Sequence, residues 1–125
     1  GNYKGKFLST GGCEEFAETF FNELTADAYF LEYDTPRSGD FSPLSYVPKG
    51  KIIVLGLVSS KTPETQTQQD IIQKIEEATK FIDIGQLALS PQCGFASTVA
   101  GNPISLEDQK AKLAMVVEVA EKVWG

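Results

Sequence analysis

The chain has 125 residues, 42% of them hydrophobic, and a formal net charge of −6. This length and apolar content are typical of one domain that covers residues 1–125. The acidic charge and the lack of a basic cluster argue against nucleic acid or anionic lipid as a partner. No apolar run reaches the roughly eighteen residues that a membrane span needs, and no secretory signal pattern opens the sequence.

The sequence holds two cysteines, Cys13 and Cys93, and no histidine. Two cysteines allow at most one disulfide, and their wide separation without a secretory signal predicts reduced thiols and a cytoplasmic location. The lack of histidine excludes a Cys–His nucleophilic pair within this chain. Cys13 precedes an amphipathic segment and is interpreted as structural.

The first predicted elements are a helix from Glu14 onward and a strand from about Ala28 to Tyr33. A loop rich in turn residues, "DTPRSGDFSP", follows the strand. The helix carries apolar side chains at helical spacing: Phe16, Ala17, Phe20, Phe21 and Leu24.

The segment "KIIVLGLVSS" is an almost continuous apolar run, which is typical of a strand buried on both faces of a parallel sheet. A capping pair of Thr67 and Asp70 then begins a second helix, and "QLALS" is a third short strand. Ser105 and Asp108 cap the last helix. The predicted buried face of the second helix is Ile71, Ile72, Ile75, Ala78 and Thr79, and that of the last helix is Leu113, Val116, Val117, Ala120, Val123 and Trp124.

Strands that alternate with helices predict an α/β fold with parallel pairing through right-handed crossovers. Three strands make a thin sheet, and a complete eightfold barrel needs about 250 residues. We therefore expect roughly half of a (β/α)8 TIM barrel, with about three parallel strands and flanking helices. A small open α/β sheet is the alternative.

Ligands of parallel sheets bind at the carboxyl ends of the strands. We expect the polar residues that follow the three strands to converge there: Glu32, Asp34 and Arg37 after the first, Ser59, Ser60 and Lys61 after the second, and Cys93 after the third. No glycine-rich phosphate-binding motif follows a strand.

Glu32 ends an apolar strand, and a buried carboxylate needs a cation or several hydrogen-bond donors. An ion pair with Arg37 or Lys61 would satisfy it, and so would a metal ion. Cys93 follows Ser90 and Pro91 rather than lying inside the strand, so it is either a structural thiol or a ligand or nucleophile. Gly94 beside it would leave room for a ligand to approach. Glutamate and cysteine are both competent zinc ligands, but two fall short of a complete site.

Three blocks, "LEYDTPRSGDFSPL", "KIIVLGLVSSKTPE" and "LALSPQCGFASTVAGNP", resemble the C-terminal catalytic barrel of cobalamin-independent methionine synthase. The resemblance is greatest to the methionine synthase II branch and covers essentially the whole chain. It implies the C-terminal half of that barrel, and a methyltransferase that moves a methyl group from methyl-tetrahydrofolate to the thiol of homocysteine without cobalamin.

In that family, zinc is held by a His-x-Cys pair, a glutamate at a strand end and a cysteine before a glycine. By motif, the glutamate matches Glu32 and the last cysteine matches Cys93. The His-x-Cys pair belongs to an "H-x-C-R-G-N" segment whose last two residues match Gly1 and Asn2, so the other two ligands are expected upstream.

Lys61 stands in the segment where the family has a histidine, and we expect it to supply a catalytic charge. Asp34, Arg37 and Ser59 are the expected substrate contacts. The chain alone is expected to be inactive, to bind zinc weakly and to form a homo-oligomer, because half of a barrel leaves sheet edges unpaired. The alternatives are related zinc-dependent alkyl transfer to another thiol and a non-catalytic binding or assembly module.

Overall fold

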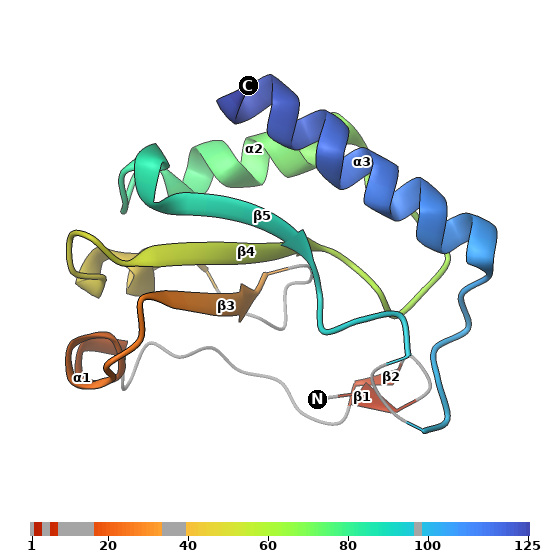
Figure 1. Ribbon diagram of the computed structural model, residues 1–125, viewed down its shortest axis with the longest axis horizontal. Coiled ribbons are helices and arrows are strands. Elements are labelled where there is room, and N and C mark those ends of the chain that lie inside the picture. The colour runs from red at the N-terminus through yellow and green to blue at the C-terminus, as the bar shows by residue number, and fades with distance from the viewer. Residues whose placement is uncertain (1, 4–5, 8–16, 34–39, 97–98) are drawn as a thin grey trace.

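A computed structural model describes residues 2–3, 6–7, 17–33, 40–96 and 99–125 (Figure 1). Its centre is a parallel sheet in the order β3 (Ala28–Glu32), β4 (Ile52–Val58) and β5 (Leu87–Pro91). The α-helices are α1 (Ala17–Glu23), α2 (Gln68–Ala78) and α3 (Leu106–Trp124). Short 3-10 helices η3 (Ser42–Tyr46) and η4 (Ile84–Gln86) precede β4 and β5, and β1 (Asn2–Tyr3) pairs antiparallel with β2 (Lys6–Phe7).

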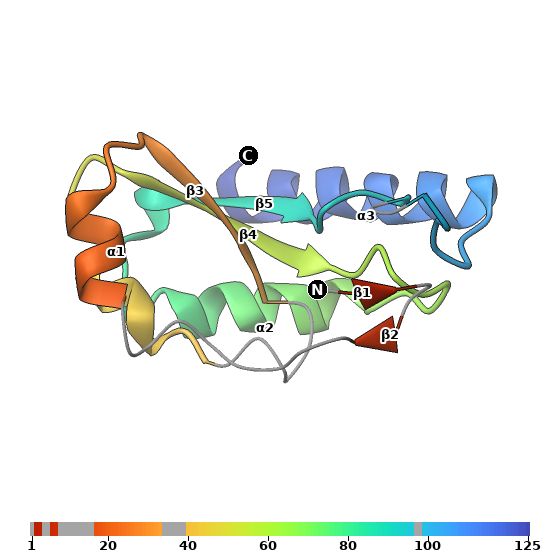
Figure 2. The ribbon, with the colours of Figure 1, turned by 90° about the horizontal axis from the view of Figure 1, so that it is seen from below.

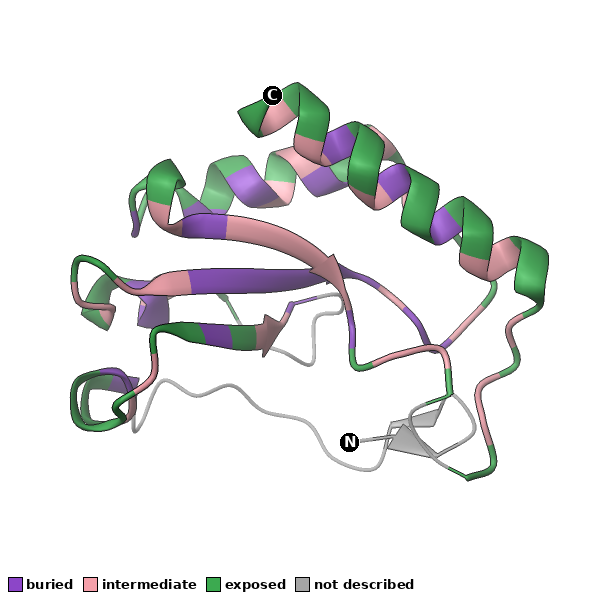
Figure 3. Cartoon of the chain, viewed as in Figure 1, coloured by how far each residue is buried: buried purple, intermediate pink, exposed green. Residues whose placement is uncertain are grey.

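This architecture confirms the prediction of three parallel strands with flanking helices. Each predicted strand has its counterpart within one or two residues at either end. The apolar run in β4 is buried along residues 53–58, as expected for a central strand covered on both faces (Figure 3). Within the described residues, no helix is both long and apolar enough to cross a lipid bilayer.

The strand register places the carboxyl ends of the strands level with one another. Glu32 on β3 pairs with Gly56 on β4, which pairs in turn with Ser90 on β5. The register then shifts between Gly56 and Val58, so that Val58 is opposite Pro91. Because proline has no backbone N–H, it suits the end of an edge strand where the ladder is interrupted.

The two faces of the sheet have different surroundings. Alternate residues of β4, namely Ile53, Leu55 and Leu57, lie in the core that the helices cover. In Figures 1 and 2, no helix among the described residues lies in front of the opposite face. Phe30 on that face is 75% exposed. The candidate site lies at the carboxyl end of this second face.

Helix α2 begins as predicted, at a capping box formed by Thr67 and Asp70. Its buried residues are Ile71, Ile75 and Ala78, while Ile72 is only partly buried. Thr79 is exposed as the residue that ends the helix, so its predicted place on the buried face was wrong.

Helix α3 begins at the second predicted box, Ser105 with Asp108, but its predicted face was wrong in part. The buried residues are Lys112, Met115 and Val119, with Val116, Ala120 and Val123 partly buried. Leu113, Val117 and Trp124 are exposed. The helix has apolar residues around most of its circumference, so hydrophobicity alone does not show which side faces the sheet.

Candidate functional site

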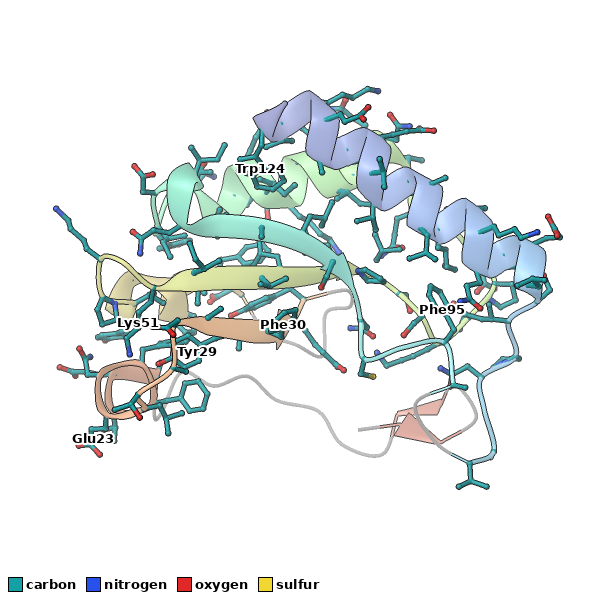
Figure 4. All side chains as sticks on the ribbon, in the orientation of Figure 1. Glu23, Tyr29, Phe30, Lys51, Phe95 and Trp124 are labelled. Carbon is teal, nitrogen blue, oxygen red and sulfur yellow. The ribbon has the colours of Figure 1, made fainter. Side chains whose placement is uncertain are left out.

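A cavity of about 200 Å³ opens at the carboxyl ends of the three strands. Its lining brings together side chains from segments far apart in the sequence: Phe30, Leu31, Glu32, Gly56, Ser90, Pro91, Gln92 and Cys93. The predicted convergence of Glu32 and Cys93 is therefore present in the structure. Phe30, which is labelled in Figure 4, forms part of the apolar wall.

Gly56 lets the strands approach one another at the floor of this cavity. A Cβ atom at Gly56 would lie 3.1 Å from the backbone oxygen of Leu31 and 3.7 Å from the Cα of Gln92. The 3.1 Å contact is tight and is made with a backbone atom, so no side-chain rotation could relieve it, whereas 3.7 Å is an ordinary van der Waals distance. Glycine therefore allows β3 and the end of β5 to bring Glu32 and Gln92 to either side of β4.

Glu32 forms an ion pair with Lys61, with 3.7 Å between the carboxylate Oε2 and the ammonium Nζ. This is one of the two ion pairs that the sequence allowed. The Lys61 side chain is only 2% exposed, whereas that of Glu32 is 38% exposed. A buried ammonium needs a nearby negative charge, and Glu32 supplies one from the next strand.

Cys93 is an exposed free thiol, which does not suit the alternative of a structural thiol within the core. It is held in a tight turn, because the Gly94 N–H donates to the Gln92 carbonyl at 2.8 Å. Gly94 has a φ of +106°, which other residues rarely adopt. A Cβ atom there would meet nothing within 4 Å, so the glycine is needed for its backbone conformation and not, as the sequence suggested, for room.

The loop that carries Lys61 is fixed from two directions. The buried Lys112 of α3 donates to the backbone oxygen of Glu64 at 2.5 Å. The amide of Asn102 donates to the Ser60 carbonyl at 2.9 Å and lies 3.5 Å from the Gly94 carbonyl. Asn102 therefore links the Lys61 loop to the turn that carries Cys93. Lys112 was not predicted, because a lysine in a helical pattern looks like a surface residue, and no motif in the sequence points to Asn102.

The family model of the cobalamin-independent synthase catalytic domain matches residues 12–122, which is most of the chain. The chain belongs to this family. Two curated relatives from Bacillus subtilis strain 168, the uncharacterized proteins YxjG and YxjH, are 49% and 46% identical to it over 125 residues. The match covers 99% of this chain but 33% of each relative, so the chain spans about a third of their length.

Solved structures agree with this cobalamin-independent synthase fold. A candidate vitamin-B12-independent methionine synthase from Listeria monocytogenes is 38% identical, with a TM-score of 0.67 over 90% of this chain and 32% of its own. A B12-independent methionine synthase from Shewanella sp. W3-18-1, solved with selenomethionine, is 23% identical, with a TM-score of 0.71 over 88% of this chain and 30% of its own. These neighbours have a TIM-barrel-type fold.

The donor atoms at the site fit the chemistry of zinc but do not complete a zinc site. A glutamate oxygen and a cysteine sulfur line the same cavity, and zinc binds both types of ligand. Zinc sites in proteins use three or four protein ligands. Within the described residues, no group of three or more His, Cys, Asp or Glu side chains is placed to hold a metal ion.

Other residues predicted for the site stay predictions. Asp34 and Arg37 lie outside the described residues, as does Cys13, which was interpreted as structural and not as part of the site. The Ser59 hydroxyl accepts a hydrogen bond from the backbone N–H of Lys61 at 3.3 Å, within the loop after β4. Gln92 lines the cavity and was missed, although it lies two residues after Ser90 and so could share its side of the strand.

Proposed function

We propose that this chain is part of a zinc-dependent methyltransferase that moves a methyl group from methyl-tetrahydrofolate to the thiol of homocysteine, in the cytoplasm. Membership of the cobalamin-independent synthase family supports the reaction class. The observation that carries the assignment is the cavity at the strand ends, where Glu32 and Cys93 meet. Because the chain spans a third of its relatives, the remaining protein ligands and much of the substrate site would come from outside residues 1–125.

Glu32 and Cys93 would hold the zinc through one carboxylate oxygen and one thiolate sulfur. When bound, zinc favours the deprotonated, nucleophilic form of a coordinated thiol near neutral pH. Lys61 would keep the carboxylate of Glu32 oriented toward the cavity through their ion pair. The apolar side chains of Phe30 and Pro91 would lie beside the reacting sulfur.

The transfer is a displacement at carbon. The bond between the methyl carbon and the folate nitrogen breaks as the bond between that carbon and the substrate sulfur forms. The electron pair of the broken bond stays on the nitrogen, which takes a proton from solvent. In this scheme Lys61 contributes a fixed positive charge beside Glu32.

Zinc retention after dialysis tests this proposal. We would compare this chain with a longer protein in which a His-x-Cys segment precedes it. We expect the longer protein to retain about one zinc ion per chain and the 125-residue chain to retain much less, since it offers two ligands in one cavity. Cys93→Ser should abolish retention by the longer protein, and Cys13→Ser is the matched control that should preserve it.

Methyl transfer would then be assayed with methyl-tetrahydrofolate and homocysteine in the longer protein. We expect activity that Cys93→Ser removes and Cys13→Ser keeps. Zinc retention that survives Cys93→Ser, or a zinc-loaded longer protein that produces no methionine, would contradict the proposal.

A further inference from the structure

Asn102 lies between the loop that carries Lys61 and the turn that carries Cys93, and its side chain connects them. The side-chain nitrogen donates to the Ser60 carbonyl at 2.9 Å and, over a longer distance of 3.5 Å, to the Gly94 carbonyl. A carboxamide nitrogen carries two N–H groups, so it can serve both carbonyls at once. Ser60 directly precedes Lys61, and the turn continues from Cys93 into Gly94. One side chain therefore joins the two backbone segments.

The turn is attached to the rest of the chain on both sides of the Cys93 thiol. On the near side, the Gln92 N–H donates to the Val58 carbonyl of β4 at 3.0 Å. The Gly94 N–H then donates to the Gln92 carbonyl at 2.8 Å and closes the turn on itself. On the far side, the Gly94 carbonyl accepts from Asn102. The two attachments together fix where the turn, and with it the exposed thiol, lies relative to β4.

The amide of Asn102 is held in place by its closeness to α3. Asn102 lies three residues before Ser105, which caps this helix, and its backbone carbonyl accepts from the Ile104 N–H at 2.8 Å. Helix α3 in turn packs on the core through the buried Met115 and Val119. A residue supported by a packed helix positions a site more precisely than one on an unsupported loop. The position of the turn therefore depends on the packing of α3.

We propose that Asn102 is a positioning residue for the zinc ion, which holds the Cys93 thiol beside Glu32 before the metal binds. This inference rests on the proposed function. The same side chain acts on the second ligand, because Ser60 leads into Lys61, and Lys61 is ion-paired with Glu32. Ligands that are already in place lose less conformational freedom when the metal binds, which favours binding. Residues that orient metal ligands typically contribute about 10–100-fold to metal affinity.

The zinc affinity of the longer protein, in which a His-x-Cys segment precedes this chain, tests the inference. Asn102→Asp keeps the shape of the side chain but replaces the donor nitrogen with an acceptor oxygen. We expect it to raise the Kd for Zn²⁺, measured in competition with a chelator, about tenfold or more. The added negative charge would by itself favour a cation, so a raised Kd reports the loss of the two hydrogen bonds.

Cobalt(II) gives a second readout, because the charge-transfer absorption between this metal and a thiolate sulfur reports whether Cys93 is bound. We expect this absorption, per bound Co²⁺, to be weaker in Asn102→Asp than in wild type, since the thiol is no longer held in place. A residue that served only the stability of the fold would leave the spectrum of the folded protein unchanged. Asn102→Ala removes the donor without adding a charge, and it should change both measurements in the same direction.

Asn22→Asp is the matched control. The Asn22 side chain also donates to a backbone carbonyl, that of Glu18 at 2.7 Å, and the substitution makes the same change of charge at an exposed position of α1. Its Kd and cobalt spectrum should be those of wild type. A wild-type Kd and spectrum in both Asn102 variants, or loss of the folded state in both, would overturn the inference, while zinc retention through Cys93 would still support the proposed function. A wild-type longer protein that retains no zinc would overturn both.

Discussion

Lys61 carries a charged side chain that is buried at the edge of the core. The carboxylate of Glu32 compensates this charge. Their ion pair spans 3.7 Å between β3 and the loop after β4, with the lysine 2% exposed. Removing one partner of a buried pair leaves the other charge less well compensated, which is worse for stability than removing both. The pair therefore stabilises the loop as well as orienting the carboxylate.

We expect Glu32→Gln to lower the free energy of unfolding by about 1–3 kcal/mol, less than for a fully buried pair because the glutamate is 38% exposed. The double variant with Lys61→Met should be more stable than Glu32→Gln alone. Urea unfolding of the four members of this double-mutant cycle measures the coupling. Additive effects of the two substitutions would show that the two charges do not interact.

Lys51 is a second lysine with a structural role, and it lies at the opposite end of the sheet from Lys61. Its ammonium donates to the carbonyl oxygens of Phe21 at 3.2 Å and Leu24 at 2.7 Å, and to the Tyr29 hydroxyl at 2.9 Å. Figure 4 shows Lys51 and Tyr29 next to each other beside α1. A positive charge at the end of a helix satisfies carbonyl groups that have no partner within the helix.

We expect Lys51→Met to destabilise the chain by about 1–2 kcal/mol, because a charged donor to three acceptors is lost at a half-buried position. Lys49→Met, at an exposed position two residues earlier, is the matched control and should change the unfolding midpoint little. Equal midpoints for the two variants would mean that water replaces the Lys51 hydrogen bonds without loss.

At the scale of elements, the two long helices, α2 and α3, both begin with a capping box. In α3, the Ser105 hydroxyl accepts from the Asp108 N–H at 3.1 Å, and Asp108 Oδ2 accepts from the Ser105 N–H at 3.0 Å. The Ser105 side-chain hydrogen bond, followed by the backbone one, holds the pKa of Asp108 below its ordinary value of 3.8. Thr67 has the same effect on the pKa of Asp70 in α2.

A pKa that is lower in the folded chain makes the stability depend on pH in one direction. The ionised Asp108 stabilises the folded state fully above the ordinary carboxyl pKa, and this stabilisation is lost as the pH falls through the lower folded pKa. We expect Asp108→Ala to destabilise the chain at about pH 7, and the difference from wild type to shrink at about pH 3. Glu107→Ala is the control for charge at the same helix end. A difference that stays constant with pH would contradict this account.

Much of this arrangement could be predicted from the sequence. Short-range signals located the elements, because Thr67 with Asp70 and Ser105 with Asp108 mark helix starts, and the apolar run of β4 marks a central strand. The rule that parallel strands share a carboxyl edge predicts that Glu32 and Cys93 lie at the same end of the sheet, where both line the cavity.

Other features could not be predicted because they depend on packing between distant segments. Packing against β5 and α2 determines which side of α3 faces the core. The sequence of the helix alone does not show which side this is. The pairing register shifts between Gly56 and Val58, and the buried Gln92 follows the end of β5. The sequence of one segment does not show whether a polar side chain in it forms a hydrogen bond with a residue of another segment.

Among the described elements of the whole molecule, helix α3 exposes a large apolar surface. On α3, Leu106, Leu113, Val117 and Trp124 are 65%, 42%, 57% and 37% exposed. Their spacing places them along one side of the helix, in a stripe that is symmetric about Met115. Large exposed apolar patches of this kind are typical of interaction surfaces.

The symmetry of the stripe favours a second copy of this chain as its partner. Two α3 helices that pack antiparallel would place Leu106 opposite Trp124, and Leu113 opposite Val117. An interface around a two-fold axis requires this self-complementarity.

We therefore expect the isolated 125-residue chain to be a dimer by light scattering at micromolar concentration. Leu113→Glu should make it monomeric, because it places a charge opposite Val117 in the apolar contact. Ala114→Glu adds the same charge at an exposed position outside the stripe and should leave the dimer intact. A monomeric wild-type chain would refute self-association. A dimer that withstands Leu113→Glu would mean that the copies pair instead through the edges of the sheet at β3 or β5.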